Sequence, residues 1–176
     1  MTTIYCSNKL KDFIGPTNLK SYDNLTPNKL GDWNAHIFVY GRRKNLILIN
    51  NISYYTLIFP NIKKADFKNF EDLFIKRLSD QLLFDNIIEI EHAPILKQRL
   101  LPVKLTTTNN DRKALGTMNE YIFSFRLYMD FFELDSLDLN HINGKLNDTL
   151  VGASRPQKRD YGRPIEDMKN LMKTIL

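Results

Sequence analysis

Cysteine and histidine are scarce in this chain of 176 residues, which has one cysteine and three histidines. A single thiol cannot form a disulfide within the chain, and the histidines do not have the spacing of zinc ligands. Cys6 lies in a predicted strand, where a small buried side chain is more common than a nucleophile. The sequence therefore predicts no metal and no cofactor, and the lone thiol fits the reducing cytoplasm.

Familiar catalytic and membrane motifs are absent as well. The chain contains no P-loop, no GxGxxG turn and no GxSxG elbow. Its apolar runs are too short or too often interrupted to span a bilayer. The first residues, MTTIYCSNKLKDF, lack the charged segment and apolar core of a signal peptide. We therefore expect no membrane association, and no motif identifies an enzyme class.

The overall composition is that of an ordinary globular domain. Hydrophobic residues make up 43% of the chain and charged residues 26%, so disorder is not expected. A chain of this length can bury a core without disulfide or metal support. The net charge of +5 favours an anionic partner, such as a nucleotide or nucleic acid, although an unspecialised basic surface would give the same charge. The oligomeric state cannot be predicted.

Three short runs rich in β-branched and aromatic residues predict an antiparallel meander. They are AHIFVYG, NLILIN and YYTLIFP, separated by the turn-like RRK and NIS, and they span residues 35–60. The middle run does not alternate, so we expect that strand to be covered on both faces. Further strands are predicted at 3–7 and 100–108, with Pro102 at a strand start or sheet edge.

Apolar spacing predicts helices around the sheet. Ser7 is expected to cap a brief helix that ends at Gly15, and Asp66 to cap a helix over 66–83. Residues 86–99 are ambiguous between strand and irregular structure. A long helix is predicted for 112–132, a short one within 137–148, and a last one beginning at Pro164. The prediction is a single α+β domain, residues 1–176, in which an antiparallel β-meander sheet packs with several helices.

The segment NNDRKALGTMNE, residues 109–120, precedes the strongest apolar seam of the chain. At about 100° per residue, a polar strip runs beside that seam; it contains Arg112, Gly116, Asn119, Phe123 and Arg126. Asn109 and its neighbours either cap the helix or share its free N–H groups with an anion. A glycine inside a helix lowers its stability, so Gly116 is either tolerated or lets a ligand or backbone approach.

A second basic segment, GASRPQKRDYGRP, lies between the last two predicted helices. Arg159 and neighbouring cations could contact phosphates while Tyr161 stacks on a base. The alternative is a basic surface loop without a ligand. The basic run 42–44 lies in a predicted hairpin turn, where protection of the sheet edge is the simpler explanation.

Three blocks of the sequence resemble a family of small stand-alone bacterial proteins with a domain-of-unknown-function label. They are LGDWNA at 30–35, RKALGTMNE at 112–120 and LNDT at 146–149, and Leu150 stands where the family pattern has proline. The resemblance covers most of the chain but implies no activity. It implies that Asp32, Trp33, Arg112, Gly116 and Asn119 belong to the family pattern, either as a site or as a structural brace.

Three hypotheses follow from these observations. The first is a non-catalytic protein that binds an anionic ligand, a nucleotide or nucleic acid, through Asn109, Arg112, Gly116, Asn119, Arg126 and Trp33, with Arg159 and Tyr161 as a second arm. The second is a protein-interaction or regulatory module resembling an antitoxin, which should expose an apolar patch. The third is a small metal-independent nuclease, for which no residue stands out as a general base.

Overall fold

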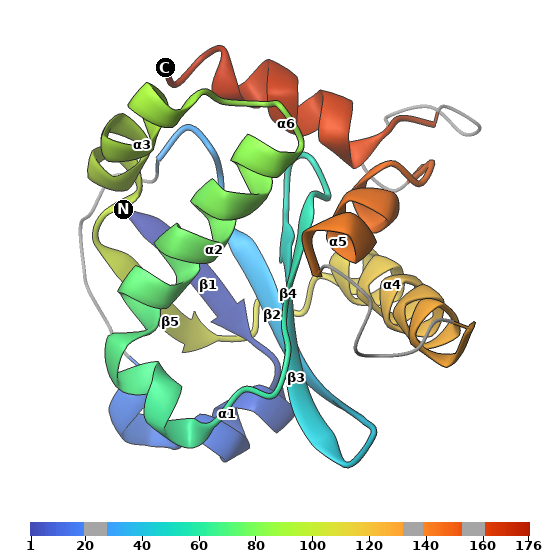
Figure 1. The fold of residues 1–176 in the computed structure, drawn as a ribbon. Coiled ribbons are helices and arrows are strands. Elements are labelled where there is room, and N and C mark those ends of the chain that lie inside the picture. Colours follow the sequence, from blue (N-terminus) through green and yellow to red (C-terminus); the bar gives the residue numbers. More distant parts are fainter. Residues whose placement is uncertain (20–27, 132–138, 153–160) are drawn as a thin grey trace.

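The computed structural model describes residues 1–19, 28–131, 139–152 and 161–176. Its centre is a five-stranded sheet in the order β4-β3-β2-β1-β5, with helices on both faces (Figure 1). The strands are β1 (Thr2–Cys6), β2 (Trp33–Tyr40), β3 (Arg43–Asn50), β4 (Thr56–Phe59) and β5 (Val103–Thr107). The α+β prediction is therefore confirmed.

The sheet is mixed, which corrects the prediction of an antiparallel meander sheet. β2, β3 and β4 do form the predicted antiparallel meander. β1, however, pairs in parallel with both β2 and β5. The physical reason is that helices lie between β1 and β2 and between β4 and β5. Such crossover connections bring the chain back to the end of the sheet where the preceding strand began.

The β2–β3 hairpin projects beyond the rest of the sheet (Figure 1). β1 pairs with β2 only as far as Cys6 opposite Ala35, so the following residues of β2 have no partner on that side. The hairpin turns at Gly41 and Arg42, which both have positive φ angles, 54° and 63°. A two-residue turn of this kind matches the twist of paired strands. Arg43 and Lys44, expected in the turn, therefore belong to β3.

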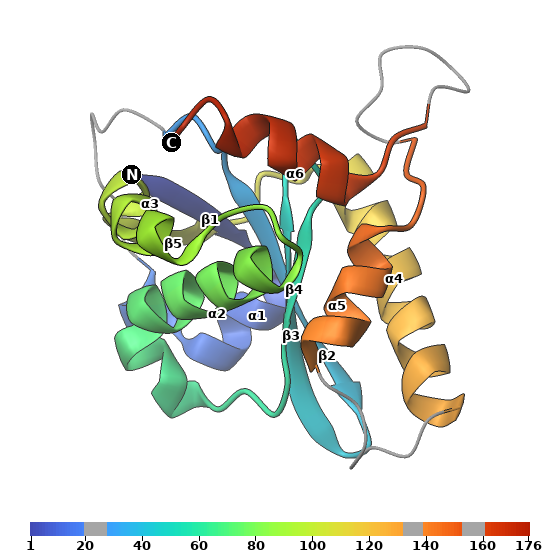
Figure 2. The same cartoon turned by 45° about the horizontal axis from the view of Figure 1, so that its top comes forward.

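Helices cover the two faces of the sheet (Figure 2). Four lie on one face: α1 (Asn8–Ile14), α2 (Phe70–Phe84), α3 (Ala93–Leu100) and α6 (Pro164–Met172). On the other lie α4 (Arg112–Phe131) and α5 (Leu139–Asn147). In β3, Leu46 and Leu48 point to the first core, and Ile47 and Ile49 to the second. This confirms that the middle strand of the meander is covered on both sides.

Several helix boundaries agree with the sequence and others do not. Ser7 caps α1, because its hydroxyl accepts a hydrogen bond from the Leu10 N–H. Asp66 does not cap α2: its carboxylate accepts from the Lys63 N–H within a preceding 3-10 segment, Lys64–Asn69, and Asn69 occupies the cap position. The ambiguous stretch is helical, with a 3-10 turn at Ile90–His92 leading into α3. A further 3-10 turn spans Pro16–Asn18.

α5 closes the sheet edge formed by β4. Asn143 and Asn147 lie one turn apart and are fully buried. Their side-chain oxygens accept hydrogen bonds from the Ile58 and Thr56 N–H groups, at 2.9 and 2.7 Å. The Arg77 Nε of α2 donates to the Ile58 carbonyl. These side chains take the place of a neighbouring strand, which satisfies backbone groups that burial would otherwise leave unpaired.

Within the described ranges, no helix combines the length and apolar character needed to cross a bilayer. Even α4, whose 20 residues would measure about 30 Å, carries charged residues on its solvent side.

Candidate functional site

The N-terminus of α4 is capped by the protein's own side chains. The Asp111 carboxylate accepts hydrogen bonds from the Lys113 and Ala114 N–H groups, at 3.0 and 3.1 Å. The Asn109 side-chain oxygen accepts from the Asp111 N–H at 3.1 Å. Two of the free N–H groups that could attract an anion are thus occupied by a carboxylate. Capping accounts for Asn109 and Asp111 without a ligand.

The predicted strip on α4 faces solvent. Arg112, Gly116, Asn119 and Arg126 are all exposed. A Cβ atom built on Gly116 would have no neighbour within 4 Å, so no backbone or side chain of the described structure approaches it closely. Arg126 reaches the projecting hairpin, where its guanidinium donates to the Val39 carbonyl at 3.5 Å. The four residues therefore share one helix face but do not surround a cavity.

Trp33 lies apart from that face. It is fully buried in the core on the opposite side of the sheet. Its ring packs edge-on against Phe74 of α2, with 5.3 Å between centroids. Its Nε1 is buried without a hydrogen-bond partner in the described structure. Trp33 and the α4 residues consequently do not form one surface, because strand alternation points Trp33 away from α4.

The second basic segment is only partly described. Arg159, like Arg155 and Lys158, lies outside the described residues. Tyr161 is exposed, and the following Gly162 forms an isolated bridge with Val151. Arg163 forms an ion pair with Asp148 at the end of α5. The possible phosphate contact of Arg159 therefore stays a prediction.

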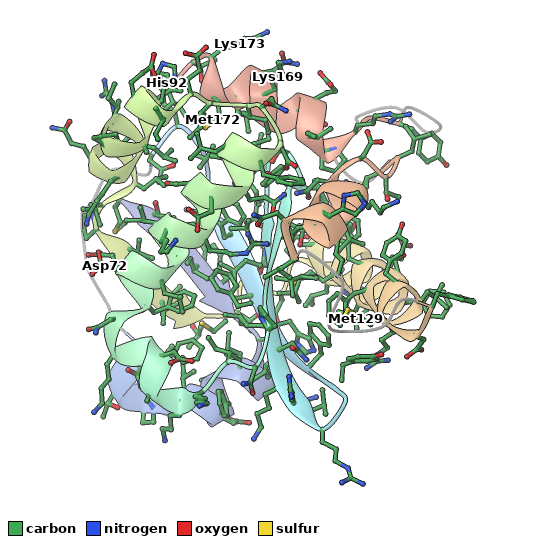
Figure 3. The ribbon with its side chains drawn as sticks, viewed as in Figure 1. Asp72, His92, Met129, Lys169, Met172 and Lys173 are labelled. Carbon is green, nitrogen blue, oxygen red and sulfur yellow. The ribbon has the colours of Figure 1, made fainter. Side chains whose placement is uncertain are left out.

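A cavity of about 420 Å³ lies between the tip of the β2–β3 hairpin and the C-terminal half of α4. Tyr40 and Phe125 form part of its wall, with their rings edge to face at 5.8 Å. Met129 adds a flexible apolar side chain on the side of α4 that faces the sheet (Figure 3). This volume falls within the range of small-molecule sites, roughly 300–1,000 Å³.

The polar part of this hairpin cavity is supplied by β3 and the chain after β4. The Asn45 side chain donates to the Arg43 carbonyl at 3.1 Å and accepts from the Asn61 N–H at 3.1 Å. These bonds fix the floor of the cavity. The Arg43 guanidinium has no carboxylate or carbonyl partner in the described structure, although Arg43 lines the cavity. An unpaired guanidinium beside aromatic rings can bind an anion that has a flat apolar part.

Among the described residues around the cavity, several carry positive charge. Arg42 and Arg43 stand at the hairpin tip and Arg126 lies along its edge, all exposed. The Asp130 carboxylate of α4 accepts a hydrogen bond from the hydroxyl of the lining residue Tyr40 at 2.7 Å. That bond raises the pKa of Tyr40, so the phenol stays protonated at neutral pH.

Sequence analysis did not single out most of this cavity. The sequence predicts edge protection for Arg43, a strand position for Tyr40 and a place in the apolar seam of the long helix for Phe125. Only Arg126, at its margin, was among the candidate site residues. The available signal was a basic hairpin tip directly following an aromatic residue, and it carries no information about which helix packs beside it.

Cys6, the only cysteine of the chain, belongs to the core on the first face of the sheet. Cys6 is fully buried, and burial raises the pKa of its thiol to about 12. Its burial confirms the prediction of a small core residue in a strand. In the described part of the chain, no three His, Cys, Asp or Glu side chains gather as metal ligands.

Comparison with known families places the chain. The model of a domain of unknown function, DUF6933, matches residues 3–167. The chain belongs to the DUF6933 family. No curated protein and no solved structure matches it. The match runs from β1 into α6, so DUF6933 covers both layers of helices and the hairpin cavity, and it brings no activity with it.

In this DUF6933 domain, the first of the three sequence blocks is held against the β3–β4 turn. The buried Asn50 side chain donates to the Leu30 carbonyl at 2.9 Å and accepts from the Ser53 N–H at 2.9 Å. Gly31 has a φ of 82°, and a Cβ there would lie 2.6 Å from the Ile52 side chain. Only glycine fits such a position without strain. This block therefore has a structural explanation.

The other two blocks approach the same turn of the DUF6933 domain. Burial, and after it the charge of Asp111, which directly precedes the second block, raise the pKa of Tyr54 in the turn. The third block supplies Asn147, bonded to Thr56. Bracing of this region thus accounts for Asn147. It leaves Arg112, Gly116 and Asn119 unexplained.

Proposed function

We propose that this protein is a non-catalytic binding protein for an anionic ligand, a nucleotide or a segment of nucleic acid, held in the hairpin cavity. One observation carries the proposal: the Arg43 guanidinium, without a partner in the described structure, lines a cavity of about 420 Å³ that also contains the Tyr40 and Phe125 rings. The family match does not indicate a function.

The ligand class follows from the chemistry of the cavity wall. A guanidinium offers paired N–H donors that match the oxygens of a phosphate. Tyr40 and Met129, which are both half-buried and line the cavity, present apolar surface on which a base can lie. The cations at the hairpin tip and the net charge of +5 attract polyanions over longer distances. A nucleotide combines the required charge and flat apolar group in one molecule.

The proposal is non-catalytic because of what lines the cavity. Among the described lining residues there is no histidine, cysteine, serine or acidic side chain. A general base or nucleophile would have to come from outside this wall. Asp111, the carboxylate considered for a nuclease, is engaged as the cap of α4. Binding alone uses the groups that the cavity offers.

Isothermal titration with nucleoside mono-, di- and triphosphates, and fluorescence anisotropy with labelled oligonucleotides at low salt, test the proposal. Replacing Arg43→Ala should weaken binding roughly 10- to 150-fold, since a hydrogen bond to a charged group contributes about 1.5–3 kcal/mol. Met129→Trp should fill the cavity and weaken binding without removing a charge.

Two arginine variants serve as controls. Arg99→Ala removes a cation on α3, on the other face of the sheet, and should change affinity little. Arg112→Ala tests the N-terminal half of α4 as an alternative site. Binding lost in Arg112→Ala but retained in Arg43→Ala would move the site away from the cavity. Absence of binding to every nucleotide and oligonucleotide at low salt would overturn the proposed function.

A further inference from the structure

The solvent face of α4 is divided into a bulky half and an open half. Phe123, Leu127 and Phe131 follow one another at four-residue intervals, with exposures of 62%, 40% and 80%. Residues four apart form a continuous row on a helix. The N-terminal half of the same face carries Gly116, whose missing Cβ would meet nothing within 4 Å, and the exposed Asn119. In both views α4 is the outermost helix on its side of the sheet (Figures 1 and 2).

We propose that this face pairs in antiparallel orientation with α4 of a second copy of the chain. An antiparallel pair places the bulky half of each helix on the open half of the other. Leu127 then packs over Gly116 of the second copy, where the absent side chain lets the helices approach closely. This pairing supplies the reason for Gly116 that the isolated chain lacks. It does not depend on the proposed ligand.

Charge supports the same register. Arg112 and Asp130 lie eighteen residues apart, which is five full turns of an α-helix, so both point to the same flank. A two-fold axis perpendicular to the helices reverses their direction but keeps each flank on its own side. Asp130 of one copy therefore faces Arg112 of the other, twice per dimer. Arg112 has no ionic partner in the described structure, and the Tyr40 bond leaves one carboxylate oxygen of Asp130 free.

The opposite flank is complementary too. Lys113 and Phe131 are also eighteen residues apart, so the ammonium of one copy faces the exposed ring of the other in a cation–π contact. The midpoints of the three pairings, Arg112 with Asp130, Lys113 with Phe131 and Gly116 with Leu127, all fall within residues 121–122. The packing of Leu127 on Gly116 and the two charged contacts thus favour the same antiparallel register. An identical chain presents the complementary residues at the required positions.

The size of the contact sets the expected strength. A single pair of helices about 30 Å long buries on the order of 1,000 Å² in total, near the lower limit for a specific interface. We expect a reversible dimer that dissociates in the micromolar range rather than an obligate one. Most of the stabilisation comes from covering the three bulky side chains.

Sedimentation equilibrium and size exclusion with light scattering, over a wide concentration range, test for the dimer. Leu127→Asp and Gly116→Leu should each raise the dissociation constant at least tenfold. Ile90→Asp changes a large apolar side chain that is 77% exposed but lies outside α4, and it should leave the dimer intact. Arg112→Asp and Asp130→Arg should each weaken the dimer, and the double variant should restore it. Circular dichroism shows that each variant is folded.

Cross-linking tests the orientation directly, because Cys6 is buried and is the chain's only cysteine. A mixture of the single variants Arg112→Cys and Asp130→Cys should form a disulfide between copies. Either variant alone should not. Cross-linking of each variant with itself would indicate a parallel pair and overturn the proposal, as would a monomer at all concentrations. Nucleotide binding by a purely monomeric protein would overturn the dimer and leave the proposed ligand site standing.

Discussion

The side chain of Asn147 and the backbone of Thr56 are joined by hydrogen bonds in both directions. The Asn147 oxygen accepts from the Thr56 N–H at 2.7 Å, and its amide nitrogen donates to the Thr56 carbonyl at 3.2 Å. Both residues are fully buried. Asn147 thus pairs with both backbone groups of Thr56 at a sheet edge that has no further strand.

Replacing Asn147→Ala should therefore lower the free energy of unfolding by about 1–3 kcal/mol, because it leaves the buried Thr56 N–H without a partner. Urea denaturation followed by circular dichroism measures the change. Asn119→Ala is the matched control, since Asn119 is exposed on α4 and should change stability by less than about 0.5 kcal/mol. Equal effects of the two variants would contradict the edge-closing role of Asn147.

Asp111→Ala should lower stability by about 0.5–2 kcal/mol, the usual effect of losing an N-cap side chain. The cause is loss of the acceptor for the Lys113 and Ala114 N–H groups. Asp111→Ser keeps an acceptor and should recover most of the stability. Urea denaturation compares the stabilities of the two variants, through their midpoints at an unchanged denaturant dependence. If Asp111→Ala were as stable as the parent, the carboxylate would be free for another role, including that of a ligand contact.

The sequence predicted the elements that are determined by residues close together in the chain. The apolar seam of α4, the Ser7 cap of α1 and the unbroken apolar run of β3 each depend on neighbouring residues, and each is present in the structure. The pairing of β1 with β2 and β5 was not predictable in this way. This pairing depends on where the crossover helices pack, and the residues of β1 do not indicate which strands lie beside it.

The same distinction between local and long-range causes applies to the candidate site. Capping residues before α4 and the polar strip on its face follow from spacing alone. The burial of Trp33 on the other side of the sheet does not, since an aromatic at a strand start can point to either face until the register is known. The hairpin cavity joins Tyr40 to Phe125, residues far apart in the chain. Such a cavity appears only when the tertiary packing is known.

Gly116→Ala should raise the stability of the dilute, monomeric protein by up to about 1 kcal/mol, because alanine is the better helix former and the new methyl group meets no neighbour. Gly144→Ala is the matched control within α5. A Cβ there would lie 3.0 Å from the Asp85 carboxylate and 3.6 Å from the Phe84 ring. Gly144→Ala should therefore gain less stability than Gly116→Ala, or lose stability. Thermal unfolding at low protein concentration measures both. A loss of stability in Gly116→Ala would mean that the new methyl group clashes with a neighbour, contrary to the open space around Gly116.

Cys6 predicts a specific loss of stability in alkali. Burial raises the pKa of its thiol from an ordinary 9.0 to about 12 in the folded chain. The folded pKa lies above the unfolded one, so the contribution of this group is complete below pH 9 and is lost as the pH rises from 9 towards 12. The unfolded chain releases the proton first, and its equilibrium population then grows. The full effect is on the order of 4 kcal/mol.

Urea unfolding between pH 7 and 10.5 tests this, with Cys6→Ala as the comparison. The parent should lose stability faster than Cys6→Ala above pH 9, so the difference between them should shrink. The comparison also removes the contribution of buried tyrosines such as Tyr121, whose pKa is likewise raised by burial. A thiol reagent at pH 8 should modify native Cys6 only as fast as the chain opens. Rapid labelling with a constant stability difference would mean that the thiol reaches solvent in the folded protein.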